Sequence, residues 1–313
     1  MDDAAGDGNT DRFSGFADLY DANRPSPPRA LGPLLVSYAN VPRPAVVDLG
    51  SGTGLSSRWA AGWAGSVIGI EPNDDMRAAA EARHTRVVSY ARGVSHRTGL
   101  EDHVADVVLA VQAMHWMDPE STLAEVVRIL RPGGVFAIAD ADWPPVSGVA
   151  RAEQAWATLH ARIRVFEARA AQGETGDQLR RPIAVDDPAL IDEDLRDPHR
   201  NRAMPGGVRS WAKRQHLERL DASGLFAFTR ELVFNEPAAT EDGDDGGRGA
   251  ERFVALMRSQ GSYQGLLRLG MTDDELGATD FEREVRAAFA DAGARPGLSF
   301  SWRVRLGVTP PAP

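Results

Sequence analysis

The fold of this chain is decided by one stretch of sequence, VVDLGSGTG at residues 46–54. Its apolar, β-branched first half predicts a short buried strand. Its second half carries a glycine at every other position, Gly50, Gly52 and Gly54. Because glycine has no Cβ and adopts positive φ at little cost, such a turn lets the backbone pass close to a ligand. The stretch therefore predicts a strand that runs directly into a ligand-binding turn.

A second strand with an acidic end follows the first. The sequence VIGIE at residues 67–71 is apolar up to its last residue, Glu71. A glycine turn after one parallel strand and a carboxylate at the tip of the next are the means by which α/β sheets bind a nucleoside. The two strands together predict a nucleoside site and leave open which nucleoside it takes.

The composition favours a globular protein without a membrane span. Hydrophobic residues make up 42% of the 313 residues, enough for a sizeable core in one decorated domain or two small ones. No run of about 18 apolar residues exists, and residues 1–10 are acidic and polar, unlike a signal peptide. The absence of cysteine excludes disulfides, thiolate catalysis and cysteine metal sites, and it fits a cytoplasmic protein.

The charge balance disfavours nucleic acid as a substrate. The formal net charge is −10, and the sequence has no strong run of lysine and arginine. A protein that binds a long phosphate backbone usually presents a basic face. Scattered arginines, or the segment 196–214, could still form a local patch. We therefore expect neither nucleic acid nor a membrane as a partner.

Strands and helices alternate through the first half of the chain. Strands are expected at 45–49, 67–71, 87–90, 105–111 and 135–139, and helices at 29–38, 55–63, 74–83 and from Asp118 to the Pro132-Gly133-Gly134 turn. Two later segments, 226–234 and 298–308, alternate like half-buried strands. The pattern predicts an α/β fold: a doubly wound, mostly parallel seven-stranded sheet of Rossmann-like type, with an antiparallel last strand and a helical lid insertion.

The chain after Trp143 departs from this alternation. Helices are expected at 150–171, 210–220, 251–269 (weakest at Gly261) and 280–292, the last capped by Gly293. We expect residues 1–12 to be a disordered tail and 13–313 to form a single domain. Its parts are a core at 13–143, insertions at 144–220 and 235–280, and final strands and helix at 221–234 and 281–313.

Several motifs, in this order and spacing, resemble one known family. Besides residues 46–54 and Glu71, they are YDANRP at 20–25, ADVVLAVQAMHW at 105–116 and LRPGGVF at 130–136. The chain resembles the class I S-adenosylmethionine-dependent methyltransferases, in their small-molecule, type 11-like branch. The resemblance covers residues 13–143 and returns more weakly in the last strands. It implies methyl transfer from S-adenosylmethionine to a small molecule, which we expect to be a secondary metabolite, with the two insertions as a lid over the acceptor.

Three alternatives compete with this interpretation. A nicotinamide dinucleotide fold has the fingerprint G-x-G-x-x-G, but here the third glycine comes one residue early and Leu55 takes its expected place. The chain could instead bind the donor without methylating anything, as a regulator or a cyclisation catalyst. Methylation of RNA or protein is the third alternative, and the acidic net charge argues against RNA.

The resemblance also assigns residues to the donor. Backbone around Gly50 would meet the amino-acid end of S-adenosylmethionine, Asp48 would position the turn, and Glu71 would accept hydrogen bonds from the ribose diol. Ser95, or the backbone of Val94, would lie at the adenine, where this chain has GVSH in place of the common G-x-A-E; His96 should face solvent. The full expected set is Tyr20, Arg24, Asp48, Gly50, Gly52, Gly54, Glu71, Asn73, Met76, Ser95 and Gln112, with Tyr20 and Arg24 closing over the donor and Arg24 near its carboxylate.

The acceptor should be bound at the ends of strands four and five. Gln112 and His115-Trp116 lie just beyond the fourth strand, and Trp143 follows the fifth. His115 is either a general base or part of the pocket wall, and Trp116 and Trp143 are candidates for that wall. No pair of histidines has ligand spacing, so we expect no metal. Asp140 and Asp142 are the weak exception, as possible Mg²⁺ ligands.

Overall fold

The structure is a computed structural model that describes residues 21, 23–83, 85–181, 202–203, 209–237, 249–292 and 297–312. The expected tail at 1–12, Tyr20 and the expected helix cap Gly293 lie outside the described residues.

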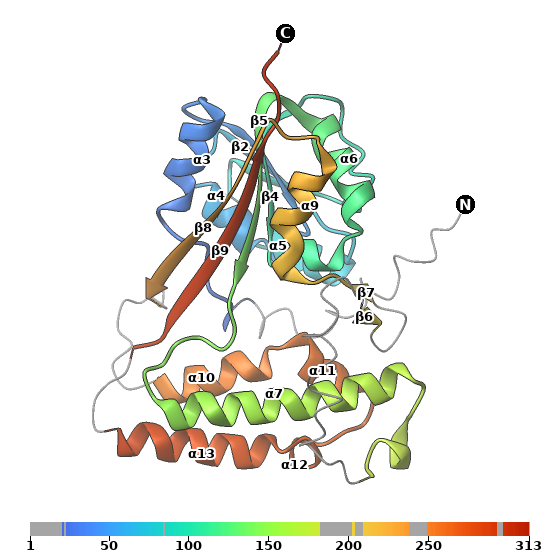
Figure 1. Ribbon diagram of the computed structural model, residues 1–313, viewed down its shortest axis with the longest axis vertical. Helices are drawn as coiled ribbons and strands as arrows, with labels where there is room; N and C mark the ends of the chain where they lie inside the picture. The colour runs from blue at the N-terminus through green and yellow to red at the C-terminus, as the bar shows by residue number, and fades with distance from the viewer. Residues whose placement is uncertain are drawn as a thin grey trace.

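A seven-stranded sheet forms the upper part of the molecule as drawn in Figure 1, and a sheet of this size was predicted. Its strands lie in the order β3-β2-β1-β4-β5-β9-β8. Their bounds are β1 Ala45–Leu49, β2 Ser66–Ile70, β3 Val88–Ala91, β4 Ala105–Val111, β5 Leu130–Ala141, β8 Phe228–Pro237 and β9 Ser299–Val308. The first five strands pair in parallel, and β9 is antiparallel to both of its neighbours. The mostly parallel sheet with an antiparallel last strand is therefore confirmed.

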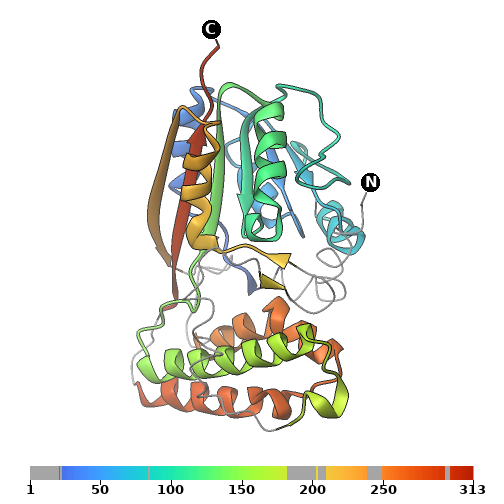
Figure 2. The same ribbon diagram turned by 45° about the vertical axis from the view of Figure 1, so that its right-hand side comes forward.

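Helices cover both faces of the sheet (Figure 2). Successive residues of a strand point to opposite faces. Val46 belongs to the same apolar cluster as Leu31 and Leu35 of α3, and Val47 belongs to a second cluster with Leu123 and Val126 of α6. On the first face lie α3 (Leu31–Ala39) and α4 (Leu55–Ala60); on the second lie α6 (Pro119–Ile129) and α9 (His216–Ser223). Helix α5 (Asp74–Glu81) joins β2 to β3. Two-sided burial explains the near-continuous apolar strands.

A separate layer of helices lies beyond the ends of the strands (Figure 1). It consists of α7 (Ala150–Ala171), α10 (Gly249–Arg258), α11 (Gly261–Arg268), α12 (Asp273–Leu276) and α13 (Ala278–Asp291). Trp156 is 2% exposed at its centre, with the Phe253 ring centroid 5.1 Å away and that of Phe281 6.3 Å away. These aromatic side chains hold the layer together, and they belong to the same apolar cluster as one face of the sheet.

Three elements differ from their predicted place or length. Helix α13, expected with the final strands, packs on α7 and α10 in the helical layer. Helix α9, expected in the insertion, covers the sheet beside α6, because His216 and Leu220 give it a buried face. Helix α6 begins at its Asp118 cap but ends at Ile129, since Leu130 is already extended (ψ 139°) two residues before Pro132.

The helix expected at 251–269 is interrupted near its predicted weak point. Helix α10 ends at Arg258 and α11 begins at Gly261. Glycine costs helix stability. The break leaves the backbone carbonyl of Ser259 accessible to a side chain from the N-terminal segment, as described below.

Candidate functional site

The glycine turn after β1 has the backbone conformation that its sequence predicts. Gly50, Gly52 and Gly54 have φ of 66°, 55° and 81°. A Cβ on Gly54 would lie 2.1 Å from the Tyr90 hydroxyl, and one on Gly50 would lie 2.9 Å from Ala113. A Cβ on Gly52 would meet no atom within 4 Å. Gly50 and Gly54 are thus held by packing, and Gly52 is the point where a ligand can approach the backbone.

Glu71 ties the tip of β2 to this turn. Its Oε2 accepts a hydrogen bond from Gly52 N at 2.9 Å, and its Oε1 accepts one from Asn73 N at 2.9 Å. Burial raises the pKa of this carboxyl, and the two backbone donors oppose the shift. Each carboxylate oxygen keeps a further lone pair. Glu71 is therefore fixed in orientation and can still accept hydrogen bonds from a diol.

Asn73 and Met76 act within helix α5. Asn73 caps the helix, because its Oδ1 accepts a hydrogen bond from Met76 N at 2.9 Å. The Met76 side chain is 2% exposed and lies in the interior. Both residues hold the β2–α5 corner beside Glu71. Their contact with a ligand stays a prediction.

Asp48 is a buried carboxylate at the end of β1. Its Oδ2 accepts hydrogen bonds from the hydroxyls of Ser56 at 2.7 Å and Ser57 at 2.6 Å, which fixes the first turn of α4. Its Oδ1 is buried and has no hydrogen-bond partner among the described residues. Burial raises the pKa of Asp48 to about 6, against the effect of the two hydroxyls. An unsatisfied buried oxygen next to the glycine turn fits a ligand that brings a donor or a positive charge.

The N-terminal segment reaches the site through Asp21 and Arg24. Asp21 Oδ1 accepts hydrogen bonds from Thr53 Oγ1 at 2.7 Å and from Arg58 Nη2 at 2.8 Å, so it closes on the glycine turn. Arg24 Nη2 donates to Ser259 O at 3.1 Å, and its guanidinium lies 4.8 Å from the ring centroid of Trp143. Arg24 thereby joins this segment to the helical layer. Sequence reasoning named Arg24 and missed Asp21.

Ser95 lies in a tight turn after β3. Val94 and Arg97 exchange backbone hydrogen bonds across the turn, and the Ser95 hydroxyl lies 2.7 Å from that of Thr122 at the start of α6. His96 is exposed, as expected. The half-buried Ser95 is directed toward α6. A role for Ser95 or Val94 at an adenine stays a prediction.

Gln112 leaves β4 in a conformation that is rare for a residue with a side chain. Its φ is 52°, and its amide N donates to Ala139 O of β5 at 2.8 Å. Its Oε1 accepts a hydrogen bond from Lys213 Nζ at 2.6 Å, while its buried Nε2 has no partner among the described residues. Non-glycine residues with positive φ are strained, and the surrounding structure must hold them in place. Such residues are found more often at ligand sites than elsewhere.

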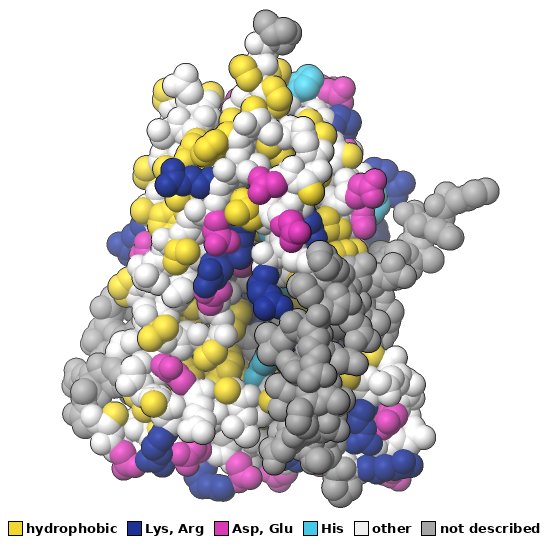
Figure 3. All heavy atoms as spheres, in the orientation of Figure 1, with side chains coloured by type: hydrophobic (Ala, Val, Ile, Leu, Met, Phe, Trp, Pro, Cys, Tyr) yellow, Lys and Arg dark blue, Asp and Glu magenta, His cyan; other side chains and the backbone are white. Residues whose placement is uncertain are grey.

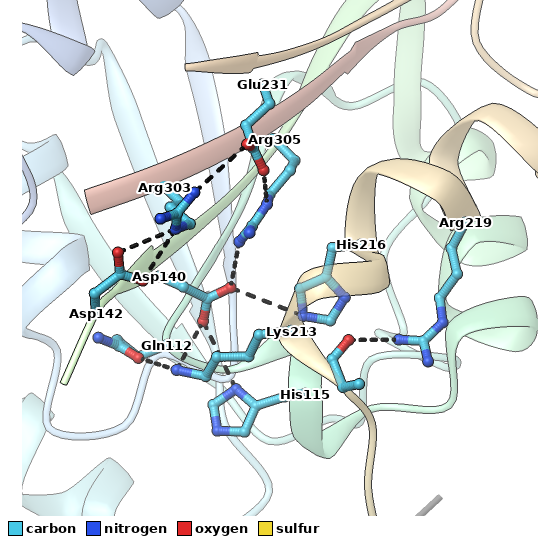
Figure 4. A network of polar contacts seen from close by, with 11 residues as sticks. Gln112, His115, Asp140, Asp142, Lys213, His216, Arg219, Glu231, Arg303 and Arg305 are labelled. Carbon is cyan, nitrogen blue, oxygen red and sulfur yellow. Dashed lines mark hydrogen bonds and ion pairs between the residues drawn. The ribbon is translucent and has the colours of Figure 1, made fainter. Parts of the chain in front are cut away.

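Asp140, at the end of β5, lies at the centre of a buried network of charged and titratable groups (Figure 4). It is 2% exposed. Its Oδ1 lies 3.1 Å from Lys213 Nζ and 3.8 Å from His115 Nδ1. Its Oδ2 lies 3.4 Å from Arg305 Nη1 and 3.8 Å from His216 Nε2. Four elements in addition to β5 thus bring nitrogen groups to one carboxylate.

His216 contributes a neutral ring to this network. Burial lowers its pKa to about 4, with Arg219, Arg305 and Lys213 adding to the shift and Asp140 opposing it. The imidazole is therefore uncharged near neutral pH. The Trp116 ring packs on the other histidine of the network, 4.5 Å from the His115 ring centroid.

The carboxylates that were weak magnesium candidates face cations. Asp142 lies 3.0 Å from Arg303 Nε, and Asp140 faces Lys213 and Arg305. Within the described part of the chain, no three His, Cys, Asp or Glu side chains are grouped so that they could hold a metal ion.

Two pocket-wall candidates lie on different parts of the site. Trp143 stacks on Trp156 of α7 with centroids 6.0 Å apart and packs edge-on against Phe300 of β9. It therefore belongs to the junction with the helical layer, whereas Trp116 lies beside the Asp140 network. Sequence reasoning missed Lys213, His216 and Arg305. One signal pointed to the first: Lys213 is the only lysine in the sequence.

The outer surface is mixed in charge. On the face shown in Figure 3, acidic and basic side chains of the described residues are interspersed, without a continuous basic surface. No helix in the described ranges is long and apolar enough to cross a membrane.

Known proteins resemble part of this chain. A family described as "Methyltransferase domain" matches residues 47–138. An uncharacterized methyltransferase of Mycobacterium tuberculosis is 35% identical over 123 residues, which cover 39% of this chain and 49% of the relative. A probable S-adenosylmethionine-dependent methyltransferase of Saccharomyces cerevisiae is 29% identical over 124 residues, covering 38% and 43%. The chain thus spans about half the length of the curated relatives it matches.

A solved structure shares the whole fold. It is a type II methyltransferase candidate from Anaeromyxobacter dehalogenans, 22% identical, with a TM-score of 0.51 over 92% of this chain and 99% of that chain. At this identity the likeness concerns the fold, and it extends to the strands and helices after residue 143.

Proposed function

We propose that this chain, which belongs to the class I S-adenosylmethionine-dependent methyltransferases of the type 11 branch, transfers a methyl group from that cofactor to a small-molecule acceptor. The observation that carries the proposal is the pairing of Gly52 N with Glu71 at 2.9 Å, beside open space at Gly52. It unites an accessible backbone and an oriented carboxylate at the ends of two adjacent parallel strands, where α/β sheets bind ligands.

The residues present fit S-adenosylmethionine. Glu71 would accept the ribose hydroxyls, and the backbone at Gly50 and Gly52 would hold the amino-acid end. Asp48 Oδ1 is unsatisfied, and burial is the largest cause of the raised pKa of both carboxyls, so a positive charge nearby would stabilise their ionised forms. When bound, the cofactor supplies a sulfonium methyl group that a nucleophile can attack in line.

The chain's own contribution to the reaction is positional. Gln112, His115, Trp116 and the Asp140 network lie at the ends of β4 and β5, next to the glycine turn. There they would hold the acceptor about 3 Å from the methyl carbon. We propose that the helical layer, with Trp143 and Arg24 at its junction, excludes water from this space. The expected secondary-metabolite acceptor and a cytoplasmic location belong to the same proposal.

Calorimetric titration with S-adenosylmethionine, S-adenosylhomocysteine and NADH tests the donor. We expect binding of both sulfur compounds and none of NADH. Tight binding of NADH alone would show that the site takes a dinucleotide and would overturn the proposal.

Methyl transfer is tested separately from binding. Radiolabelled S-adenosylmethionine is incubated with the protein and a metabolite extract, and label in small organic products is counted before and after nuclease treatment of the extract. We expect label in small products and no effect of nuclease. Donor binding without any transfer would indicate a regulator or a cyclisation catalyst, and loss of label after nuclease treatment would indicate an RNA substrate.

A further inference from the structure

The element that carries Lys213 is fixed to the turn that carries His115. Trp211 N donates a hydrogen bond to His115 O at 2.8 Å, two residues before the lysine. Lys213 Nζ is then held between Gln112 Oε1 at 2.6 Å and Asp140 Oδ1 at 3.1 Å. Gln112, just beyond β4, and Asp140 of β5 are therefore joined through the ammonium group of Lys213 (Figure 4).

The use of lysine at this point leaves room at the carboxylate. An arginine would present a flat fork and bind both carboxylate oxygens, whereas an ammonium group is a compact charge with three donors. Lys213 takes one side of Asp140 Oδ1, and His115 Nδ1 lies at 3.8 Å from the same oxygen. That distance is long for a hydrogen bond, but catalytic hydrogen bonds are often long before a substrate is bound.

The other oxygen of Asp140 is already committed. Arg305 is 3% exposed and lies 3.4 Å from Asp140 Oδ2, and it also donates to Glu231 at 2.7 Å. His216 faces the same oxygen as a neutral ring. The charged and titratable groups that face the Asp140 carboxylate in the described residues thus include His115, Lys213, His216 from α9 and Arg305 from β9. Of the two histidines facing Asp140, His115 is the one that lies at the end of β4, on the acceptor side.

We propose that Asp140 is the positioning residue for His115 as an acceptor base, that Lys213 holds the Asp140 carboxylate in place, and that the acceptor is consequently a nucleophile bearing a proton, a hydroxyl or an amine. The inference rests on the proposed methyl transfer. In this arrangement Nδ1–H of His115 donates a hydrogen bond to Asp140 and keeps its proton, so the lone pair of the neutral ring lies on Nε2, the ring nitrogen remote from Asp140.

The step balances as follows for an acceptor X–H. The X–H bond breaks and its proton passes to Nε2 of His115. The electron pair left on X forms the bond to the methyl carbon, and the pair of the broken carbon–sulfur bond stays on sulfur. The imidazolium that results is stabilised by Asp140, and it later releases its proton to solvent.

The protonation of His115 can be measured without knowing the acceptor. Long-range ¹H–¹⁵N spectra of the imidazoles across pH give both the tautomer and the pKa of each histidine, assigned through a His115→Gln variant. In the native protein we expect the Nδ1–H tautomer for neutral His115. Asp140→Asn removes a negative charge and should lower the pKa of His115 by about one unit, whereas Lys213→Met removes a positive charge and should raise it.

Asp142→Asn is the matched control. Asp142 lies two residues further along the chain, just beyond the end of β5, and pairs with Arg303, so its variant should leave the tautomer and pKa of His115 unchanged. Asp140→Asn and Lys213→Met should shift the pKa of His115 in opposite directions. A general loss of structure would instead shift the pKa of His115 in the same direction in both variants. A dominant Nε2–H tautomer in the native protein, or shifts of equal sign, would overturn the inference.

Turnover provides the second measurement. With labelled donor and metabolite extract, Asp140→Asn should lose about 100-fold in rate, the lower range for general-base catalysis, with donor affinity unchanged within about twofold. The loss should diminish as pH rises and the acceptor ionises by itself. An undiminished rate in Asp140→Asn would overturn the inference while leaving the proposed function intact. Absence of donor binding in the native protein would refute the proposed function instead.

Discussion

The two sides of the site are built in different ways. The donor side, which is the glycine turn with Asp48 and Glu71, is made by neighbours in sequence: Gly52 and Glu71 are 19 residues apart, and Asp48 and Ser56 are 8 apart. The acceptor side, which is the network around Asp140, joins Lys213 to Gln112 over 101 residues and Arg305 to Asp140 over 165. One side follows from a single strand–turn–strand unit, and the other exists only once the whole sheet is assembled.

The two sides also differ in electrostatics. On the donor side, buried carboxylates are bonded chiefly to neutral hydroxyl and backbone N–H groups, and burial raises their pKa. On the acceptor side, the carboxylate of Asp140 faces a lysine and an arginine. Negative charge is thus incompletely balanced where we propose that a cationic donor binds, and it is balanced where the acceptor binds. The variants below test this contrast.

Gly54→Ala should have the largest effect on stability. The new Cβ would lie 2.1 Å from the Tyr90 hydroxyl at a φ of 81°. The left-handed backbone costs about 1–2 kcal/mol and overpacking about 1–3 kcal/mol, so we expect a loss of about 3 kcal/mol in the free energy of unfolding. Urea unfolding followed by circular dichroism measures it.

Gly52→Ala is the matched control for that variant. Its φ is also positive, at 55°, but its Cβ meets no atom within 4 Å. We expect a loss of only about 1–2 kcal/mol from the backbone, together with at least a tenfold loss of donor affinity. Equal destabilisation by both variants would show that packing on Tyr90 does not distinguish the two positions.

Glu71→Gln should weaken the donor side without unfolding it. The amide keeps one acceptor oxygen, so one of the two backbone N–H groups now faces an NH₂ group, and the charge toward the ribose is lost. A hydrogen bond to a charged group contributes about 1.5–3 kcal/mol, so donor affinity should fall about 30-fold in a calorimetric titration. Asp74→Asn, an exposed carboxylate in the first turn of α5, should leave the affinity unchanged.

Stability should depend on pH with opposite sign on the two sides. The pKa of Asp48 is raised to about 6 from 3.8. The stabilisation of the folded state that comes from this shift is therefore present below about pH 4 and is lost as pH rises through 6. The pKa of His216 is lowered to about 4 from 6.5, so its contribution is present above pH 6.5 and is lost as pH falls through 4. The largest cause of both shifts is burial.

Urea unfolding between pH 4 and 7.5, without ligand, measures these two contributions. The stability of the native protein relative to Asp48→Asn should fall as pH rises, and relative to His216→Asn it should fall as pH decreases. Each change should be on the order of 1–2 kcal/mol across the window. Parallel curves for either variant and the native protein would show that the carboxyl or the imidazole has the same pKa in the folded and unfolded states.

The contrast explains what could be predicted from the sequence. The residues of the donor side could be predicted because strand periodicity, glycine spacing and the acid at position 71 are local signals. All of them lie within a stretch of about 30 residues. The mostly parallel sheet followed from the alternation of strands and helices, and its antiparallel last strand followed from the late alternating segments. The structure confirms that sheet.

The acceptor side could not be assembled in the same way. Arg305 occupies one of the polar positions in the alternating pattern of β9, and nothing in its neighbours indicates that β9 inserts beside β5 and brings it to Asp140. His216 sits on a helix that was assigned to the insertion, although it packs on the sheet. The location of α13 in the helical layer is also set by tertiary packing. An apolar helix face does not by itself indicate whether the helix packs on the sheet or on other helices. Partners distant in sequence leave no periodic signal.

Arg24 lies at the boundary of the two sides, and its variant should have the smallest effect. The resemblance places Arg24 near the donor carboxylate, whereas the structure directs its Nη2 to Ser259 O and its guanidinium over Trp143. Arg24→Met keeps a long apolar side chain but loses the hydrogen bond to Ser259 and the cation–π contact with Trp143, so stability should fall by about 1 kcal/mol, with donor affinity changed less than threefold.

Arg43→Met is the control for Arg24→Met, because Arg43 also donates from Nη2 to a backbone carbonyl, that of Ala64, at 3.0 Å and away from the site. Amide hydrogen exchange separates the two variants. Arg24→Met should speed exchange at the junction of α10 and α11, where Ser259 lies, and Arg43→Met should not. A tenfold loss of donor affinity in Arg24→Met alone would place Arg24 on the donor side. The N-terminal segment would then close over the cofactor, and its bond to Ser259 would belong to the ligand-free state.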